Sequence, residues 1–167
     1  NGRILKEGIS TVIVGKPNAG KSSLLNTLLG EERAIVTEIA GTTRDVLEEQ
    51  INLNGIVLNI IDTAGIRDTD DIVEKIGVDK ARKYVKDADL ILYVVDASTN
   101  LDENDREIMK LLHGRRTIVL LNKSDLTPLT TAEDIRAHVD KDCPVISIST
   151  REQKGIDVFT EQIREMF

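Results

Sequence analysis

The sequence has only one cysteine, Cys143, in its 167 residues. A single thiol excludes both a disulfide framework within the chain and a zinc site built from several thiolates. We therefore expect Cys143 to be a partly buried structural residue. The sequence also lacks any apolar run close to the roughly 20 residues that a membrane-spanning helix needs. We expect no association with a membrane.

The first residues lack two other features. The chain begins Asn1-Gly2-Arg3, with neither an initiator methionine nor the apolar segment of a signal peptide. This beginning indicates a part excised from a longer protein, and we expect that protein to be cytoplasmic.

An excess of basic residues is missing as well. The chain has 29 Asp and Glu residues against 22 Lys and Arg, a formal net charge of −7. Domains that bind nucleic acid usually present a basic face, so we expect that this domain does not hold RNA by itself. The length fits one globular domain that spans residues 1–167.

What the sequence does contain is a regular alternation of short apolar runs and helix-like stretches. It predicts an α/β fold, a mostly parallel six-stranded sheet with one antiparallel strand and helices on both faces. The predicted strands are residues 11–14, 46–53, 56–62, 90–96, 117–121 and 145–148. The predicted helices are residues 22–29, 77–86, 102–112, 131–139 and 155–166, the first of them ended by Gly30. Asn54-Gly55, between two strands, predicts a hairpin.

Residues 15–22 carry the strongest functional signal. They read Gly-Lys-Pro-Asn-Ala-Gly-Lys-Ser, between a predicted strand and a predicted helix, and match the phosphate-binding P-loop. Glycines let backbone N–H groups surround a phosphate chain, and the helix N-terminus adds partial positive charge. We expect Lys21 to bridge the β- and γ-phosphates and Ser22 to bind Mg²⁺. The predicted nucleotide contacts are Asn18, Ala19, Gly20, Lys21, Ser22 and Ser23.

A second motif, Asp62-Thr63-Ala64-Gly65, follows the predicted strand 56–62. We expect Asp62 to hold Mg²⁺ through water, as the acids of other P-loop enzymes do. The backbone N–H of Gly65 is expected to approach the γ-phosphate. Thr63 and Ala64 complete this predicted nucleotide-binding segment. Taken alone the motif is weak, because Asp and Gly are common in turns.

A third motif, Asn122-Lys123-Ser124-Asp125, follows the strand 117–121 and is expected to select the base. A carboxylate at Asp125 accepts from guanine N1–H and its exocyclic amine, whereas adenine offers no matching pair of donors. We expect Asn122 to tie this loop to the P-loop and the Lys123 stem to pack on the purine. At Ser149-Thr150, after the last strand, a backbone N–H is placed to meet guanine O6.

These ordered motifs resemble those of P-loop GTPases of the TrmE-Era-EngA-like family, and within it the G domains of tRNA-modification GTPases (the MnmE, or TrmE, family). The resemblance rests on residues 15–26, 34–45, 62–67 and 74–77 and covers essentially the whole chain. It implies a Ras-like GTPase fold and hydrolysis of GTP to GDP and phosphate.

The resemblance also implies a potassium site. Asn18 matches the family's potassium-binding asparagine, and Thr37, Ile39 and Thr42 match the loop that supplies further oxygens. A cation there would offset the charge that develops in the transition state. Thr43 would complete the Mg²⁺ shell, and Thr37, Thr42 and Thr43 would also contact GTP.

For the residue that orients the attacking water, the resemblance points to Glu74. Ras-like enzymes have a glutamine directly after the D-x-x-G motif, but this chain has Ile66, which cannot orient water. From the residues alone, Glu74 belongs to an acidic run that begins at Asp68, and this run favours a solvated loop and helix start over a catalytic role. The catalytic residues predicted on this basis are Lys21, Gly65 and Glu74.

The partners are likewise implied by the resemblance. Two G domains would meet across the switch loops in the GTP state, and the full-length protein would act with an MnmG-like partner on the wobble uridine of tRNA. The domain would be the GTP-driven conformational switch. Two alternatives stay open: a ribosome-assembly GTPase of the Era or EngA type, and a GTP-gated binding switch with negligible hydrolysis, with which Ile66 is consistent.

Overall fold

The computed structural model of the chain describes residues 8–16, 20–31, 49–53, 55–61, 82–83, 85–123, 127–150, 152 and 154–166. No helix within those ranges has both the length and the apolar character that crossing a membrane requires.

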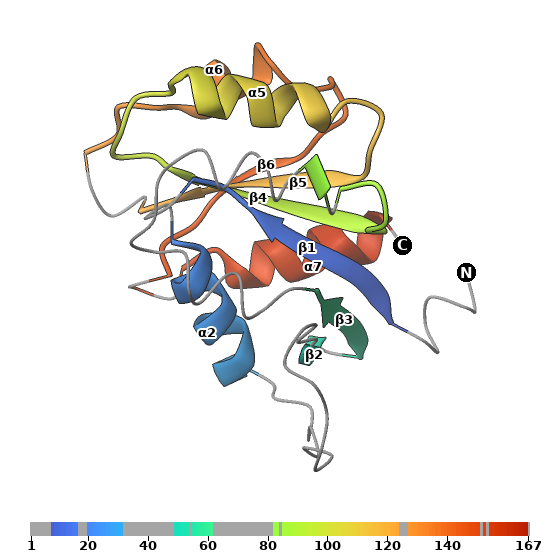
Figure 1. The fold of residues 1–167 in the computed structure, drawn as a ribbon. Helices are drawn as coiled ribbons and strands as arrows, with labels where there is room; N and C mark the ends of the chain where they lie inside the picture. The colour runs from blue at the N-terminus through green and yellow to red at the C-terminus, as the bar shows by residue number, and fades with distance from the viewer. Residues whose placement is uncertain are drawn as a thin grey trace.

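A six-stranded sheet forms the centre of the molecule, with the strand order β2-β3-β1-β4-β5-β6 (Figure 1). Only β2 runs antiparallel to its neighbour, β3, and the other pairs are parallel. The predicted fold class is therefore confirmed. The strands are β1 (Ile9–Val14), β2 (Glu49–Leu53), β3 (Ile56–Ile60), β4 (Leu90–Asp96), β5 (Thr117–Asn122) and β6 (Val145–Ser147).

The predicted hairpin is the connection between β2 and β3. Leu53 pairs with Ile56 across it. Gly55 has a φ of +91°, a conformation that glycine adopts without steric cost. Its N–H donates to Asn52 Oδ1 at 2.8 Å, which closes the turn.

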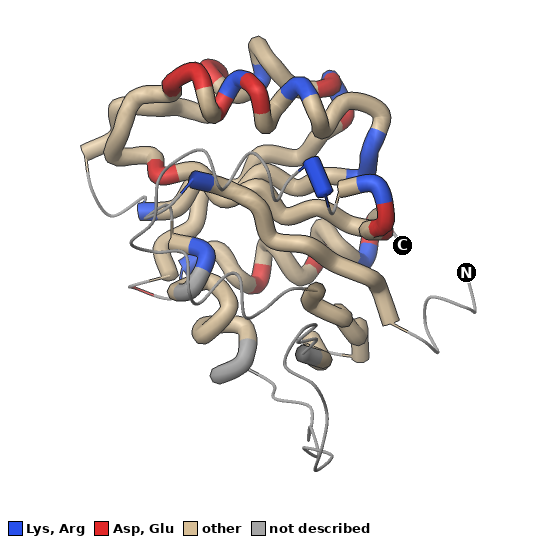
Figure 2. Tube along the Cα trace, viewed as in Figure 1, with Lys and Arg blue, Asp and Glu red and all other residues tan. Residues whose placement is uncertain are grey.

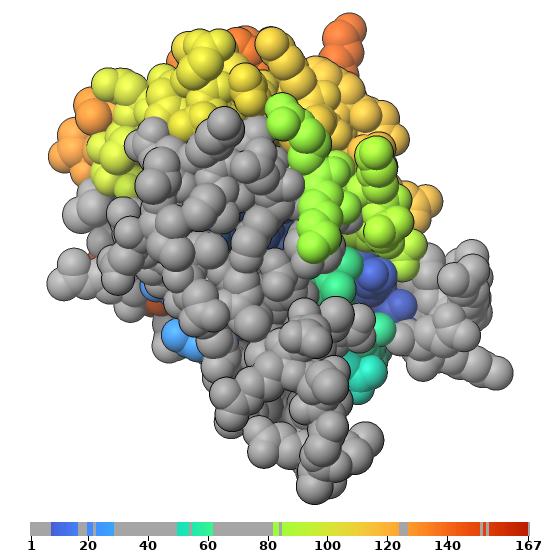
Figure 3. Space-filling view, viewed as in Figure 1, coloured from blue at the N-terminus to red at the C-terminus, as the bar shows by residue number. Residues whose placement is uncertain are grey.

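Helices cover both faces of the sheet (Figure 1). On one face lie α2 (Lys21–Glu31) and α7 (Ile156–Met166), and on the other lie α5 (Glu103–Leu111) and α6 (Ala132–Arg136). In Figure 2 the charged residues of α5 line the outside of the molecule, whereas the central strands are almost free of charge. Figure 3 shows the α5 region, in yellow, as part of the outer surface.

The two faces are built by alternation along the strands. In β4, Leu90, Leu92 and Val94 pack with α2 and α7, whereas the intervening Ile91, Tyr93 and Val95 pack with α5 and α6. Successive side chains of a strand point to opposite faces, so a strand that is covered on both sides is apolar throughout. This explains why the uninterrupted run 90–96 marks β4 with its observed bounds.

Two predicted helix ends are wrong. Helix α2 continues through Gly30 to Glu31 and does not end at Leu29. Its residues Leu24, Leu25 and Leu28 are fully buried, and this packing outweighs the roughly 1 kcal/mol that a glycine costs in a helix. Helix α6 ends at Arg136, three residues before the predicted Val139.

The early end of α6 is explained by a contact with a distant part of the chain. Asp140 binds the turn after α5, with its Oδ1 2.8 Å from His113 Nδ1 and its Oδ2 accepting from the Gly114 N–H at 2.8 Å. These contacts hold the chain away from a further helical turn. The predicted helix 77–86 falls mostly outside the described residues. Arg82 and Lys83 are helical, and Val85–Asp87 form a turn.

Candidate functional site

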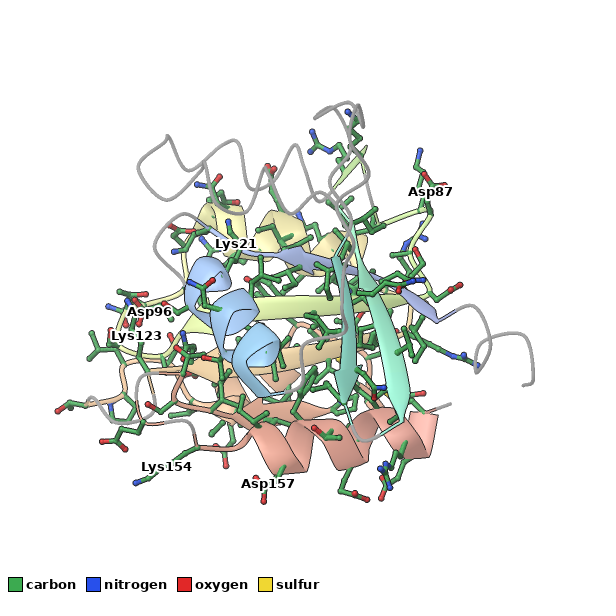
Figure 4. All side chains as sticks on the ribbon, turned by 90° about the horizontal axis from the view of Figure 1, so that it is seen from below. Lys21, Asp87, Asp96, Lys123, Lys154 and Asp157 are labelled. Carbon is green, nitrogen blue, oxygen red and sulfur yellow. The ribbon has the colours of Figure 1, made fainter. Side chains whose placement is uncertain are left out.

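The described parts of the predicted motifs gather at one end of the sheet. Because β1, β4, β5 and β6 run parallel, the residues that follow them meet at the same edge. Figure 4 shows Lys21, Asp96 and Lys123 at this edge, and Asp87 at the other end of the sheet. This arrangement places the P-loop beside the loop that is expected to read the base.

Lys21 is the first residue of α2 and is only 5% exposed. Its Nζ donates to the carbonyl oxygens of Gly15, at 2.6 Å, and Lys16, at 3.3 Å. The first turn of α2 contains no acidic residue, so the ammonium group and the helix N-terminus act together as a positive centre. This is the electrostatic environment that a phosphate chain requires.

The backbone around Lys21 is also suited to a phosphate. Ser22 is the second residue of the helix, and the Ser23 side chain is exposed. The Leu24 N–H donates to Gly20 O at 2.9 Å, which begins the helical hydrogen-bond ladder. The first N–H groups of an α-helix point out of its N-terminus, and this is the feature that anions use.

Gly20 lies directly against Asn122. Gly20 has a φ of +108°, and a Cβ atom built there would overlap Asn122 Nδ2. Asn122 is 1% exposed at the end of β5. The prediction that Asn122 connects its loop to the P-loop therefore agrees with the packing.

Asn122 also connects to the segment after β6. Its Oδ1 accepts from the backbone N–H of Thr150 at 3.2 Å and from Thr150 Oγ1 at 3.4 Å. The N–H of Ser149 donates to Lys154 O at 3.0 Å. Both N–H groups that were considered for guanine O6 thus have partners within the protein, and the longer of these bonds belongs to Thr150.

Lys123 forms an ion pair that sequence reasoning missed. Its Nζ is 2.8 Å from Asp96 Oδ2, at the end of the neighbouring strand β4. Asp96 also accepts from the N–H and the Oγ of Ser98. Burial by itself raises the pKa of Asp96, but the hydrogen bonds from Lys123 and Ser98 hold it below its ordinary value. The sequence feature that could have pointed to this ion pair is Asp96 itself, an acid at the carboxyl end of an apolar strand.

Asp96 and Asn122 are register partners in β4 and β5. In addition, the Ala97 N–H donates to Asn122 O at 2.9 Å. Lys123, with a φ of +64°, turns the chain immediately after this pair. Lys123, the first residue of the loop that is expected to read the base, is thus fixed by the sheet and by the Asp96 carboxylate.

The remaining predicted site residues lie outside the described residues, so they stay predictions. They are Asn18, Ala19, Thr37, Ile39, Thr42, Thr43, Asp62, Thr63, Ala64, Gly65, Glu74 and Asp125.

The described residues contain no cluster of three or more His, Cys, Asp or Glu side chains that would hold a metal ion.

Cys143 lies far from this edge, beside a cavity of about 230 Å³ that is lined by residues near the start of β5 and β6. Its Sγ is 3.4 Å from Thr117 O. Burial and the nearby carboxylates of Asp140 and Asp142 raise the pKa of the thiol to about 11. The prediction that Cys143 is partly buried is confirmed.

Comparison with known proteins agrees with this site. Residues 10–123 match the family described as 50S ribosome-binding GTPase. The chain is 58% identical over 167 residues to the tRNA modification GTPase MnmE of Lachnoclostridium phytofermentans, and 57% identical over 166 residues to that of Clostridioides difficile. These alignments cover 100% and 99% of this chain but 36% of each relative.

Among solved structures, the G domain of the FeoB iron transporter of T. maritima is similar, with a TM-score of 0.62 and 26% sequence identity. The match covers 94% of this chain and 97% of that G domain. The shared architecture, the P-loop lysine and the residues around Asn122 lead to one conclusion: the chain belongs to the 50S ribosome-binding GTPase family of P-loop proteins.

Proposed function

We propose that this chain binds GTP with Mg²⁺ and hydrolyses it to GDP and phosphate with stimulation by K⁺. In this proposal residues 1–167 form a single G domain, the conformational switch of a larger enzyme that modifies the wobble uridine of tRNA. The similarity to MnmE relatives over the whole chain supports this assignment. The single observation that carries the chemistry is the buried Lys21 ammonium at the start of α2.

In the proposed mechanism Lys21 holds the β- and γ-phosphates, and the backbone of residues 18–23 surrounds them. Ser22, Thr43 and Asp62 are the proposed Mg²⁺ ligands, the last through water. When bound, Mg²⁺ neutralises charge on the phosphate oxygens. The Gly65 N–H donates toward the γ-phosphate.

Guanine is recognised at the neighbouring loop. Asp125 accepts from the guanine N1–H and amine, and the Lys123 stem packs on the base. The Asp96 contact to Lys123 Nζ supports this role, because it fixes the end of the Lys123 side chain. The Thr150 N–H would exchange its 3.2 Å bond to Asn122 for guanine O6.

The rate of hydrolysis is proposed to depend on two further groups. Glu74 orients the attacking water, since Ile66 has no polar atom to do so. Asn18, Thr37, Ile39 and Thr42 hold K⁺, which offsets charge in the transition state as an arginine finger does. Two G domains then meet across their switch loops in the GTP state.

The proposed partners of the full-length protein are tRNA and an MnmG-like protein, and its proposed location is the cytoplasm. The relatives that share this region are almost three times as long as the chain. The tRNA chemistry is therefore assigned to the whole protein, and only the GTP-driven step to this domain.

The decisive experiment is GTP turnover by the chain with Mg²⁺, in K⁺ and in Na⁺ at equal ionic strength. We expect clear stimulation by K⁺, and its loss in Asn18→Ala. We expect Glu74→Ala to lower turnover by 10²-fold or more, the scale of a lost general base, while GTP affinity is retained. Equal and negligible turnover in both salts would contradict the proposal and favour the pure binding switch.

A second candidate is a ribosome-assembly GTPase, because the matching family is described as 50S ribosome-binding. Experiments on the full-length protein distinguish the two candidate functions. Co-sedimentation with large ribosomal subunits supports the second candidate, and complementation of a strain that lacks wobble-uridine modification supports the first.

A further inference from the structure

Lys16, the second residue of the P-loop, reaches away from the phosphate-binding backbone to helix α5. Its Nζ lies 3.1 Å from Asp102 Oδ2 and 3.0 Å from Asp105 Oδ2. The Lys16 side chain is 14% exposed and that of Asp105 is 3% exposed. Removing one partner of an ion pair that is withdrawn from water to this degree is costly, because it leaves an unpaired buried charge.

Both oxygens of the Asp105 carboxylate have donors among the neighbouring residues. Its Oδ1 accepts from the Tyr93 hydroxyl of β4 at 2.6 Å. Its Oδ2 receives Lys16 Nζ and also accepts from the Asp102 N–H at 3.1 Å, which closes the capping box at the start of α5. Three donors from the P-loop, the sheet and the helix thus converge on one buried carboxylate.

The backbone next to the anchored Lys16 also contacts Lys21, the lysine that is proposed to bind phosphate. Lys21 Nζ donates to the backbone carbonyls of Gly15 and Lys16. The position of those carbonyls depends on where the Lys16 side chain is anchored. Helices α2 and α5 cover opposite faces of the sheet (Figure 1), so the P-loop is continuous with α2 on one face and fastened to α5 on the other.

From these contacts we propose that Asp105 is a positioning residue for the P-loop, which it holds through Lys16 in the geometry that grips the β-phosphate of the nucleotide. This inference rests on the proposed function, and it adds α5 to the elements that set nucleotide affinity. Asp105 does not touch the nucleotide and acts only through Lys16.

The test compares the Kd of GDP with the Kd of GMP for each variant by calorimetry. The Kd of GMP divided by the Kd of GDP measures how much the β-phosphate contributes to binding. It is unaffected by the fraction of molecules that are folded, because both ligands bind the same molecules. In Asp105→Asn and in Lys16→Met we expect this ratio to fall about tenfold, the scale of one charge-assisted hydrogen bond.

Three variants control the comparison. Lys16→Arg keeps a cation that reaches both carboxylates and should keep the ratio within about twofold of the original. Glu103→Gln removes an exposed pair with Arg106 on the same helix and should leave the ratio unchanged. Tyr93→Phe removes only the hydroxyl donor and should lower the ratio in the same direction by a smaller factor, so it serves if Lys16→Met does not fold.

The outcomes separate this inference from the proposed function. GDP binding by the unaltered chain with an unchanged ratio in Asp105→Asn would overturn the positioning role alone. An equal loss of GDP and GMP affinity would overturn it too, since it would indicate a purely structural residue. Absence of guanine-nucleotide binding in the unaltered chain would overturn the proposed function and the positioning role together.

Discussion

At the scale of single residues, Gly20 shows how closely the P-loop and the β5 end are packed. Gly20→Ala adds a Cβ that overlaps Asn122 Nδ2, in a backbone conformation that side chains rarely adopt. We expect the substitution to lower the free energy of unfolding by about 2–4 kcal/mol, from αL strain together with the overlap. Urea unfolding monitored by circular dichroism measures this change.

Gly114→Ala is the matched control, because Gly114 has a φ of +75° but open space where a Cβ would lie. Strain alone should cost about 1–2 kcal/mol there. If the two variants lose equal stability, the contact between Gly20 and Asn122 has no steric consequence.

Asp96 leads to a prediction about pH. Its folded pKa lies below the ordinary value of 3.8, so protonation favours the unfolded chain. The stabilisation is complete above the unfolded pKa and is lost as the pH falls through the folded one. Asp96→Asn should therefore lower the free energy of unfolding by about 1–2 kcal/mol at pH 7, and by less at pH 3.

Urea titrations at pH 7 and pH 3 check this dependence on pH. Asp142→Asn, at an exposed turn position, is the control and should stay within about 0.5 kcal/mol of the original chain. A cost of Asp96→Asn that is the same at both pH values would show that the ion pair with Lys123 does not stabilise the fold.

At the scale of elements, α7 closes one face of the sheet through four buried residues, Ile156, Phe159, Thr160 and Ile163. Phe159 is fully buried among residues of the sheet and α2. Phe159→Ala should lower the free energy of unfolding by about 3–5 kcal/mol, because it leaves a cavity.

Val158 is the comparison on the same helix, since it is 54% exposed. Val158→Ala should change stability by less than about 0.5 kcal/mol. Thermal unfolding of both variants measures the contrast. Similar losses in the two would mean that α7 does not seal the core as described.

The elements also show what sequence patterns determine. Strand β4 was predicted with its observed bounds, because a strand covered on both faces is apolar at every position. The Gly30 prediction failed, since a local helix-ending signal is weaker than the burial of three leucines in α2. The predicted end of α6 was wrong because the observed end depends on Asp140, which binds a turn 26 residues earlier in the chain.

The site divides in the same way. Lys21 and Asn122 belong to motifs whose spacing follows from the shape of a nucleotide, so the sequence predicts both as nucleotide-site residues, and the structure places them at the same edge of the sheet. Asp96 and Asp105 were missed, because their roles come from partners 27 and 89 residues away in the chain. Asp96 at least ends an apolar strand, whereas no local pattern distinguishes Asp105 from the acids of a solvated helix start.

At the scale of the whole molecule, nucleotide binding should appear as added stability. A ligand that binds only the folded chain, at 100 times its Kd, adds about 2.7 kcal/mol. For a domain of this size that corresponds to a rise in Tm of roughly 5–10 °C. We expect this rise in Tm with GDP and none with ADP, because adenine has no pair of donors that matches the Asp125 carboxylate.

Differential scanning fluorimetry at matched concentrations of the two nucleotides gives the answer. Asp125→Ala should lose the discrimination, while Asn26→Ala, at an exposed position of α2, should keep it. An equal rise with ADP would contradict the assignment of the N-K-x-D motif to base selection.

The strand order has a consequence for how the chain is made. Strand β1 lies between β3 and β4, yet Asp96, the last residue of β4, is synthesised long after Val14, the last of β1. At roughly 5–20 residues per second, a ribosome needs on the order of ten seconds to cover that distance. During this interval the nascent β1 has two open edges until β3 is made and one open edge thereafter, and the face that α5 and α6 cover is still exposed. Ribosome pausing between β3 and β4 would prolong that exposure, whereas pausing after β4 would not.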